Sequence, residues 1–393
     1  MLNFNYFNPG RVVFGSDTIK EVGSLVSPYG KRVLLHYGGG SIKKNGVYDQ
    51  VTNSLKNSDL EIVELSQVKP NPRLSLVKEG IEICREKNID FILAVGGGSV
   101  IDSAKAIAFG VKLSPEEDIW EDYYMRSDCV INDALPVGVV LTIPAAGSES
   151  STGSVITDWD KNLKRAVNSE TIIPRFAVMD PKTNYSLSAY QTACGISDIL
   201  AHAMERYFSD VLYNDLSDRL LEAVMRNIIA YGPLALKYPN EYRYRAEIMW
   251  TGTIAHNNLL DQGRIGDWGC HDIEHEISGI YDLAHGAGLA IVFPSWMKYL
   301  YKNHLDRFVQ FAIRVMDVDL TFDDKETIVE IAIEKLKSFY KKIGMPISLS
   351  DASIGSERIR EMAEKVFMDG RTKLGSFGKL NVDDVENILR MAL

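Results

Sequence analysis

Two short apolar runs in this chain end in the same four residues, Gly-Gly-Gly-Ser. The first run, Arg32 to Tyr37, leads into residues 38–41, and the second, Phe91 to Val95, leads into residues 96–99. A short apolar run that stops at glycines is typical of a buried strand. A helical pattern follows the second repeat directly, and strand, loop and helix in that order are typical of a parallel sheet covered by helices. No other feature of the sequence limits the choice of fold as strongly.

The first half of the chain repeats this alternation of apolar runs and amphipathic segments. The turn-like residues Asp158 to Leu163 lie between two short runs and predict a β-hairpin over Val155 to Val167. Ser99 is the expected N-cap of the helix after the second glycine loop. Further strands are expected at Glu61 to Leu65 and Pro136 to Ile143, and helices at Leu74 to Lys87 and Ser99 to Phe109.

The periodicity changes in the second half of the chain. After Asp180-Pro181 the strand pattern fades, and from Tyr190 onward a 3.6-residue period dominates. We therefore predict an α/β domain with a mostly parallel, Rossmann-like sheet over residues 1–185, and an all-helical domain over residues 186–393. Breaks between helices are expected at Gly232-Pro233, Gly263, Gly279 and Pro294.

Composition narrows the class of protein. With 393 residues, of which 46% are hydrophobic, the chain is long enough for two globular domains. A net charge of −10 argues against a nucleic-acid or anionic-membrane surface. The start, MLNFNYFNPG, has no signal-peptide pattern, no apolar run reaches bilayer length, and the four cysteines form no CxxC pair. We expect a soluble, cytoplasmic protein with reduced thiols that binds neither nucleic acid nor membranes.

The glycine loops are the first candidate site. Glycines let the backbone approach a phosphate, and the free N–H groups at a helix start bind it. Neither loop is a GxGxxG or Walker A motif, and either could be a tight turn alone, but two at equivalent strand ends favour a nucleotide site. Asp102, on the next helical turn, either stabilises the helix start or accepts hydrogen bonds from the ligand.

The first loop also predicts which nicotinamide cofactor is preferred. Sites for NAD usually have an acidic residue at the ribose 2′-hydroxyl. The segment from His36 to Lys44 has no carboxylate but has Ser41 and two lysines, Lys43 and Lys44. We therefore expect NADP(H) to be preferred over NAD(H), unless the lysines are only a solvated helix face.

Four of the seven histidines predict a metal site. Asp198 and His202 lie four residues apart in a helical segment, His271 and His275 repeat that spacing, and His285 follows next to a glycine. We choose Asp198, His202, His271 and His285 as ligands, since one carboxylate and three imidazoles suit a divalent transition metal. His275 is then a neighbour that relays a proton.

A second interpretation of the same histidines leads to another enzyme class. Residues 271–275 match HxxEH, the pattern of inverzincin metallopeptidases, in which His271 and His275 bind zinc and Glu274 takes part in catalysis. That interpretation leaves the glycine loops and the Asp198/His202 pair without a role, so we rank it as a remote alternative.

The chain resembles the iron-containing (group III) alcohol dehydrogenases, and within them the bacterial NADPH-dependent butanol dehydrogenase and aldehyde reductase branch. The similarity runs nearly end to end and departs at Ala146 and Ala284, where many relatives have threonine and proline; Ala146 puts the substrate range in doubt. Five strings carry it: YGGGSIKKNG from Tyr37, LAVGGGSVID from Leu93, LTIPAAGSES from Leu141, FAVMDP from Phe176 and DLAHGAGLAIVFP from Asp282.

The resemblance implies a dehydroquinate synthase-like alcohol dehydrogenase architecture and, at a minimum, a homodimer. It also implies the same four metal ligands, Asp198, His202, His271 and His285, with His275 as an active-site residue. The residues that it places at the cofactor are Gly38, Gly39 and Ser41 at the adenosine ribose phosphate, Gly97, Gly98 and Ser99 at the pyrophosphate, and Thr142 and Lys164 as further contacts.

The expected reaction is hydride transfer between the nicotinamide and a small aldehyde or primary alcohol. The metal, Fe²⁺ or Zn²⁺, polarises the carbonyl, and His275 is the candidate proton donor. A metal- and NAD-dependent lyase or cyclase on the same scaffold is the main alternative, but the histidines have few basic neighbours for a phosphorylated substrate, chiefly Arg206 and Arg264. A non-catalytic nucleotide-binding sensor is a further alternative. The intact set of four predicted metal ligands counts against it, because a sensor does not need an open metal site.

Overall fold

The computed structural model describes residues 1–320 and 324–393. The chain divides into two compact units. The sheet unit contains Phe7–Ser188 and Asn240–Asn258, and the helical unit contains Met1–Tyr6, Ala189–Pro239 and Leu259–Leu393. The segment Asn240–Asn258 contains the helix Tyr242–His256 and belongs to the sheet unit, whereas the predicted boundary at residue 185 assigned it to the second half.

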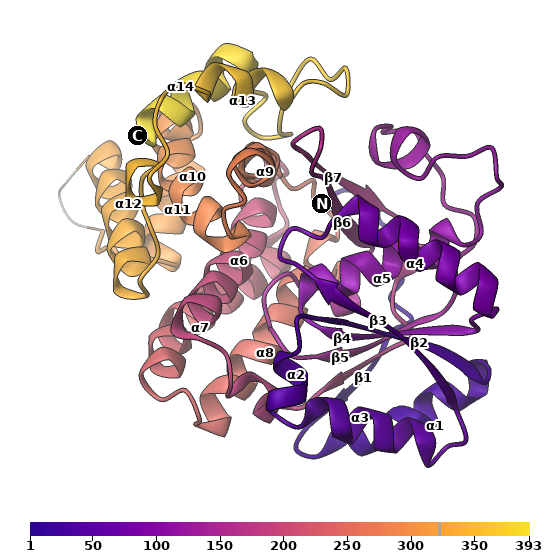
Figure 1. Cartoon of the computed structure of the whole chain (residues 1–393). Coiled ribbons are helices and arrows are strands. Elements are labelled where there is room, and N and C mark those ends of the chain that lie inside the picture. The colour runs from indigo at the N-terminus through magenta and orange to yellow at the C-terminus, as the bar shows by residue number, and fades with distance from the viewer. Residues whose placement is uncertain (321–323) are drawn as a thin grey trace. The chain divides into compact units, whose positions relative to one another are not determined.

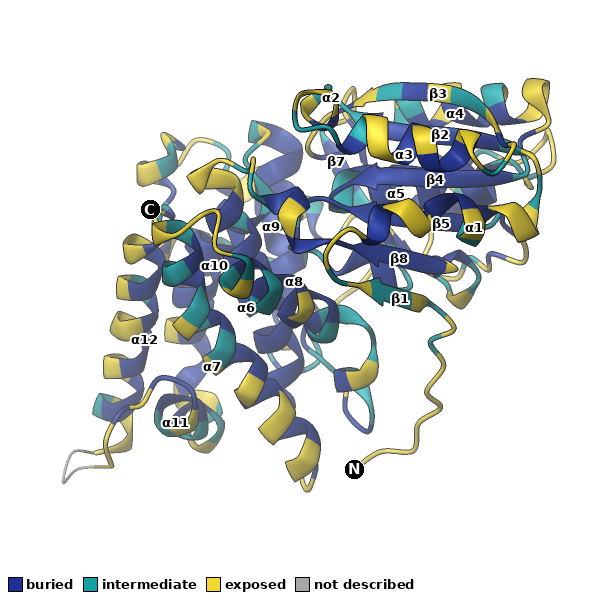
Figure 2. Ribbon diagram, turned by 90° about the horizontal axis from the view of Figure 1, so that it is seen from below, coloured by how far each residue is buried: buried dark blue, intermediate teal, exposed yellow. Residues whose placement is uncertain are grey.

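The sheet unit is built on a six-stranded parallel sheet with strand order β1-β8-β5-β4-β2-β3 (Figure 1 and Figure 2). Every residue of the central strand β4 is buried, as expected for a parallel sheet with both faces covered. The predicted parallel sheet is thus confirmed, and β1 and β8 are additional strands that the sequence analysis did not identify. The strand bounds are β1 Arg11–Phe14, β2 Arg32–Gly38, β3 Glu61–Val68, β4 Phe91–Gly96, β5 Val137–Leu141 and β8 Phe176–Met179.

Two apolar cores cover the two faces of this sheet. Alternate residues of β2 face opposite ways: Leu34 belongs to the core that includes α4 and α5, while Val33 and Leu35 belong to the core that includes α1 and α3. The predicted hairpin is present as antiparallel strands β6 and β7. The bounds are α1 Val22–Val26, α2 Ser41–Lys44, α3 Val47–Lys56, α4 Leu74–Lys87, α5 Gly98–Gly110, α8 Tyr242–His256, β6 Gly153–Asp158 and β7 Leu163–Asn168.

The start of α5 differs from the prediction. Its N-cap is Gly97, not Ser99, and no side chain caps the first turn. Gly97 packs closely against the loop that follows β5, because a Cβ added to Gly97 would lie 2.7 Å from Cβ of Ile143. The first N–H groups of α5 therefore have no side-chain cap, which is the arrangement that a helix uses to bind an anion.

The helical unit packs around α10, whose residues are almost all buried (Figure 2). Helix α10 contacts α6 and α9. In the ranges 1–320 and 324–393, no helix is both long and apolar enough to cross a membrane. The helix bounds are α6 Ala189–Tyr207, α7 Asp215–Lys237, α9 Gly269–Tyr281, α10 His285–Leu300, α11 Leu305–Arg314, α12 Lys325–Lys342, α13 Ile359–Lys365 and α14 Val382–Met391.

Three of the four predicted helix breaks are wrong. Pro233 and Pro294 lie inside α7 and α10, and Gly279 lies inside α9. A proline removes one backbone hydrogen bond and a glycine costs about 1 kcal/mol relative to alanine, and burial of these helices outweighs both. Gly232 marks a close contact between helices, because a Cβ there would lie 2.9 Å from Ile196.

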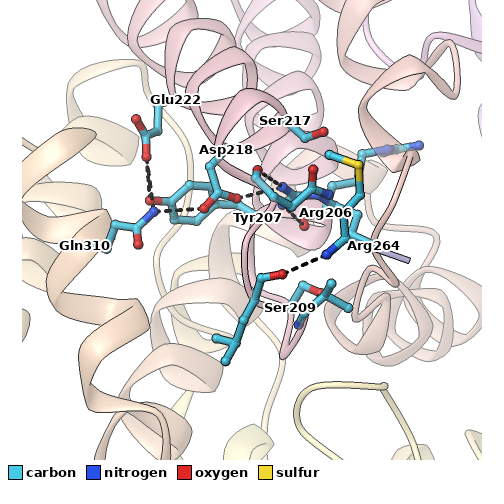
Figure 3. A network of polar contacts seen from close by, with 12 residues as sticks. Arg206, Tyr207, Ser209, Ser217, Asp218, Glu222, Arg264 and Gln310 are labelled. Carbon is cyan, nitrogen blue, oxygen red and sulfur yellow. Dashed lines mark hydrogen bonds and ion pairs between the residues drawn. The ribbon is translucent and has the colours of Figure 1, made fainter. Parts of the chain in front are cut away.

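A buried polar network fixes the C-terminal end of α6 (Figure 3). Asp218 on α7 is at its centre and pairs with Arg264 at 2.7 Å and with Arg307 at 2.6 Å. Arg264 also donates to the carbonyl of Arg206, and Arg307 donates to the carbonyl of Tyr207. Burial acts to raise the pKa of Asp218, but the two guanidinium groups outweigh it and lower the pKa to about 2.

This network predicts a specific acid dependence of stability. A carboxyl whose pKa falls from 3.8 to about 2 on folding adds about 2 kcal/mol to the free energy of unfolding above pH 4. This contribution is lost as the pH falls toward 2. We expect Asp218→Asn to be less stable than the wild type at pH 5, with the difference shrinking by that amount toward pH 2. Urea unfolding across this range measures it. Asp306→Asn is the control, since its side chain is 87% exposed; parallel curves for wild type and Asp218→Asn would contradict the assignment.

Candidate metal centre and cofactor loops

The four predicted metal ligands converge within the helical unit. Asp198 and His202 lie one turn apart on α6, His271 is on the first turn of α9, and His285 is the first residue of α10. Oδ1 of Asp198 lies 3.6 Å from Nδ1 of His202, 3.9 Å from Nε2 of His271 and 3.8 Å from Nε2 of His285.

These separations fit a shared cation better than direct hydrogen bonds. Hydrogen bonds to oxygen are about 2.7–3.2 Å long. Two ligands at about 2.1 Å from one tetrahedral metal lie roughly 3.4 Å apart, close to the observed spacing. The donor set of one carboxylate and three imidazoles suits Fe²⁺ or Zn²⁺. Asp198, His202 and His271 are themselves buried, so a cation between them would be largely shielded from water.

Local structure brings His285 to this point. Helix α9 ends at Tyr281, its C-cap Asp282 has a left-handed φ of 54°, and Ala284 is extended before α10 begins. Gly286 then lets α10 cross α6 at backbone contact, since a Cβ would lie 2.0 Å from the carbonyl oxygen of Cys194. Ser197 donates to the carbonyl of Gly286 at 2.6 Å and closes the same crossing.

Two buried glutamates hold the outer nitrogens of two predicted ligands. Oε1 of Glu205 is 2.8 Å from Nδ1 of His271 and also accepts the backbone N–H of His271 at 2.9 Å. The carboxylate of Glu274 contacts Nδ1 of His285. Both histidines are thereby oriented with Nε2 toward Asp198, an arrangement that raises the basicity of a metal-binding histidine. Burial raises the pKa of Glu205 to about 8, and a cation on the far side of His271 would favour its ionised form.

Sequence reasoning missed Glu205 as a site residue and considered Glu274 only within the metallopeptidase pattern. The available signal was a repeated spacing, because a glutamate stands three residues after both His202 and His271. The spacing does not reveal the partners, since Glu205 on α6 serves His271 on α9, and Glu274 on α9 serves His285 on α10. Only the packing of the three helices makes those pairs.

His275 lies beside two of the residues discussed above, Glu274 and the predicted ligand His285. It is buried on α9, and its ring centroid is 5.6 Å from that of His285. A donor atom of His275 lies within 4.8 Å of donor atoms of both Glu274 and His285. The prediction that it is a proton donor and not a ligand is compatible with this position and stays a prediction.

The predicted cofactor residues lie in the sheet unit, mostly where neighbouring parallel strands end. Gly38 is the last residue of β2, and Gly39 and Ser41 follow it; Gly97, Gly98 and Ser99 follow β4, and Thr142 follows β5. These strands are adjacent in the order β5-β4-β2, so their loops share one edge of the sheet. Around Gly39 and Gly40 an added Cβ would find no atom within 4 Å, which leaves room for a ligand against the backbone. Doubly wound sheets bind nucleotides at this edge.

Asp102 and Lys164 are also in this region but are buried. The Asp102 carboxylate accepts the Ser148 hydroxyl at 2.5 Å and the N–H of Val155 at 3.0 Å. Burial raises the pKa of Asp102, and the charges of Lys105 and Lys164 oppose that rise. Asp102 therefore ties α5 to β6, and the predicted contacts of Asp102 and Lys164 with the cofactor stay predictions.

Comparison with known proteins decides the family. The family model described as iron-containing alcohol dehydrogenase matches residues 9–181, and the C-terminal model of the same family matches residues 192–393. The chain belongs to the iron-containing alcohol dehydrogenase family. The resemblance noted from the five sequence strings is thus confirmed.

Named relatives within this family differ in cofactor. A Bacillus subtilis (strain 168) protein named probable NADH-dependent butanol dehydrogenase 2 is 44% identical over 100% of both chains. The NADPH-dependent aldehyde reductase YqhD of Escherichia coli (strain K12) is 35% identical over 100% of both chains. The crystal structure of NADH-dependent butanol dehydrogenase A from Thermotoga maritima has a TM-score of 0.95 and 40% identity, and the match covers 100% of this chain and 99% of that one. These relatives are alcohol and aldehyde oxidoreductases, which does not favour the lyase and metallopeptidase alternatives.

Proposed function

We propose that this chain is a metal-dependent oxidoreductase that interconverts small aldehydes and primary alcohols with a nicotinamide cofactor. The observation that carries the proposal is the convergence of His202, His271 and His285 on one carboxylate oxygen of Asp198, at 3.6–3.9 Å. A divalent cation held there would act as a Lewis acid toward a carbonyl oxygen. Bound NAD(P)H would supply the hydride.

The residues of the chain then have distinct tasks. Asp198, His202, His271 and His285 hold the cation, and Glu205 and Glu274 orient two of those histidines. His275, buried beside His285, would deliver the proton that completes reduction of the carbonyl.

An uncharged substrate fits the basic residues near this site. Arg206 pairs with Asp261 at 2.8 Å, and Arg264 pairs with Asp218 at 2.7 Å. Both arginines are buried and committed to these carboxylates, so neither is placed to bind a substrate phosphate. A small aldehyde needs no such partner, whereas a phosphorylated lyase substrate does.

The finer proposal on the cofactor is a preference for NADP(H) over NAD(H). Ser41, Lys43 and Lys44 support it by offering a hydroxyl and two cations beside the first glycine loop. Glu64 on the neighbouring strand β3 lies 3.9 Å from Lys43, so its negative charge partly neutralises this lysine. A single exposed ion pair between a lysine and the 2′-phosphate of NADP(H) contributes up to about 1 kcal/mol to binding. We therefore expect NADP(H) to be preferred about fivefold and not absolutely. Iron or zinc as the metal, a homodimeric assembly and a cytoplasmic location complete the proposal.

Oxidation of the reduced cofactor tests the proposed function. Protein purified without oxygen would be mixed with butyraldehyde and either NADPH or NADH, after removal of metal and after addition of Fe²⁺ or Zn²⁺. We expect metal-dependent loss of reduced-nicotinamide absorbance, faster with NADPH. Faster turnover of NADH would reject the cofactor preference and keep the reaction. No oxidation of either cofactor by protein shown to contain metal would reject the reaction itself.

A further inference from the structure

His285 is the predicted ligand with the weakest packing. Its side chain is 24% exposed, against 5% for His202 and 7% for His271. It is also the first residue of α10, directly after the short connection from α9, so the helix does not fix its ring as firmly as a mid-helix position would. Some other group must hold the imidazole toward Asp198.

The best-placed group is the carboxylate of Glu274. Glu274 is fully buried on α9, and its two oxygens contact the hydroxyl of Ser278 and Nδ1 of His285. The backbone leaves it little freedom, because a Cβ on Gly288 would lie 2.6 Å from its Cγ. Ser278 lies within hydrogen-bond distance of both Glu274 and the carbonyl of Leu283, in the connection before α10.

We propose that Glu274 is a positioning residue that recruits His285 to the metal by accepting its Nδ1–H and turning Nε2 inward. The site is then three ligands fixed by α6 and α9 together with a fourth whose orientation depends on one buried glutamate. This inference rests on the proposed metal site. It also differs from the metallopeptidase interpretation, in which Glu274 would act on substrate and not through His285.

Glu205 offers an internal comparison. It accepts both Nδ1–H and the backbone N–H of His271, so it docks the first turn of α9 as well as orienting one ring. The contacts of Glu274 that bear on His285 are with side chains, namely Nδ1 of His285 and the hydroxyl of Ser278. Loss of Glu205 should therefore disturb folding and metal binding together, whereas loss of Glu274 should act on metal binding.

Metal affinity measured by competition with a chelator tests the role of Glu274. The full-length metal-free protein would be titrated with Zn²⁺ and with Co²⁺, whose visible absorption reports the ligand geometry. We expect Glu274→Gln to weaken affinity 10–100-fold and to change the Co²⁺ spectrum, as is usual when a group behind a metal-binding histidine is lost. The matched control is Asp272→Asn, which removes one carboxylate charge on the same helix where it pairs with Arg371, and it should leave affinity unchanged.

A double-variant cycle separates positioning from a general effect of charge. If Glu274 acts through His285, Glu274→Gln should have almost no further effect on metal affinity in a His285→Asn background. An equal decrease in both backgrounds would overturn the proposal, and so would unchanged affinity in Glu274→Gln. Ser278→Ala, which keeps the carboxylate, is a milder second variant if Glu274→Gln folds poorly, and it should give a smaller decrease under the same cycle. Absence of metal binding by the wild type would instead reject the metal site and the proposed function with it.

Discussion

Replacing His202 with alanine is expected to abolish metal binding and turnover together. His202 is buried on α6 one turn from Asp198, with its Nδ1 3.6 Å from the carboxylate, and alanine at this position offers no ligand atom. Lewis-acid stabilisation is worth several kcal/mol, so turnover should fall by at least about 10³-fold. Metal content after dialysis and the rate of NADPH oxidation with butyraldehyde are the two measurements.

His275→Asn is the matched control, because it also removes a buried histidine of the same unit. It should retain metal, because the proposed ligand set consists of Asp198 and the three histidines whose ring nitrogens lie 3.6–3.9 Å from its carboxylate. His275 lies beside Glu274 and His285. Its turnover should still fall by about 10²–10⁴-fold, the usual contribution of a general acid. Loss of metal from His275→Asn would make His275 a ligand, and retention of metal by His202→Ala would remove His202 from the set.

The parts of the fold that could be predicted are those with a local pattern. Helix α4 begins and ends at the predicted residues, Leu74 and Lys87, because its amphipathic period runs uninterrupted between them. The strands β2 and β4 were visible because each is a buried apolar run that stops at glycines. The hairpin of β6 and β7 was visible from its turn.

The missed elements depend on distant parts of the chain. The strand β1 has only four residues and is defined by parallel pairing with β8, from Arg11 with Phe176 to Phe14 with Met179. Similarly, Pro294 should end a helix by local rules, but α10 continues through it because it is buried among other helices. Helix α8 belongs to the sheet unit although the chain has already entered the helical unit before it.

In the candidate site, too, some residues could be predicted from local spacing and others depend on packing between helices. Its proposed metal ligands could be chosen from helical spacing, because Asp198 and His202 stand one turn apart on one helix. The glutamates behind His271 and His285 could not, because each belongs to a different helix from the histidine that it holds. The glycine that permits the crossing of α6 and α10 was likewise part of a recognised string, without any indication of what it approaches.

Replacing this glycine, Gly286, with alanine is expected to damage both stability and metal binding. The new Cβ would lie 2.0 Å from the carbonyl oxygen of Cys194 and 2.9 Å from its Cα. These are backbone atoms, so no side-chain rotation can relieve the overlap, and α10 must move away from α6. Overpacking in a core costs about 1–3 kcal/mol and occasionally more, and we expect the upper end here.

The same displacement should reach the proposed metal site. Gly286 follows His285 directly, and the Ser197 hydroxyl that donates to its carbonyl lies next to Asp198 on α6. Thermal melting of the metal-free protein and chelator competition should both show a loss in Gly286→Ala. Gly39→Ala is the control for stability, because an added Cβ there meets nothing within 4 Å. If Gly286→Ala melted and bound metal like the wild type, α6 and α10 could separate at this crossing without cost, and backbone contact would not be what brings His285 to Asp198.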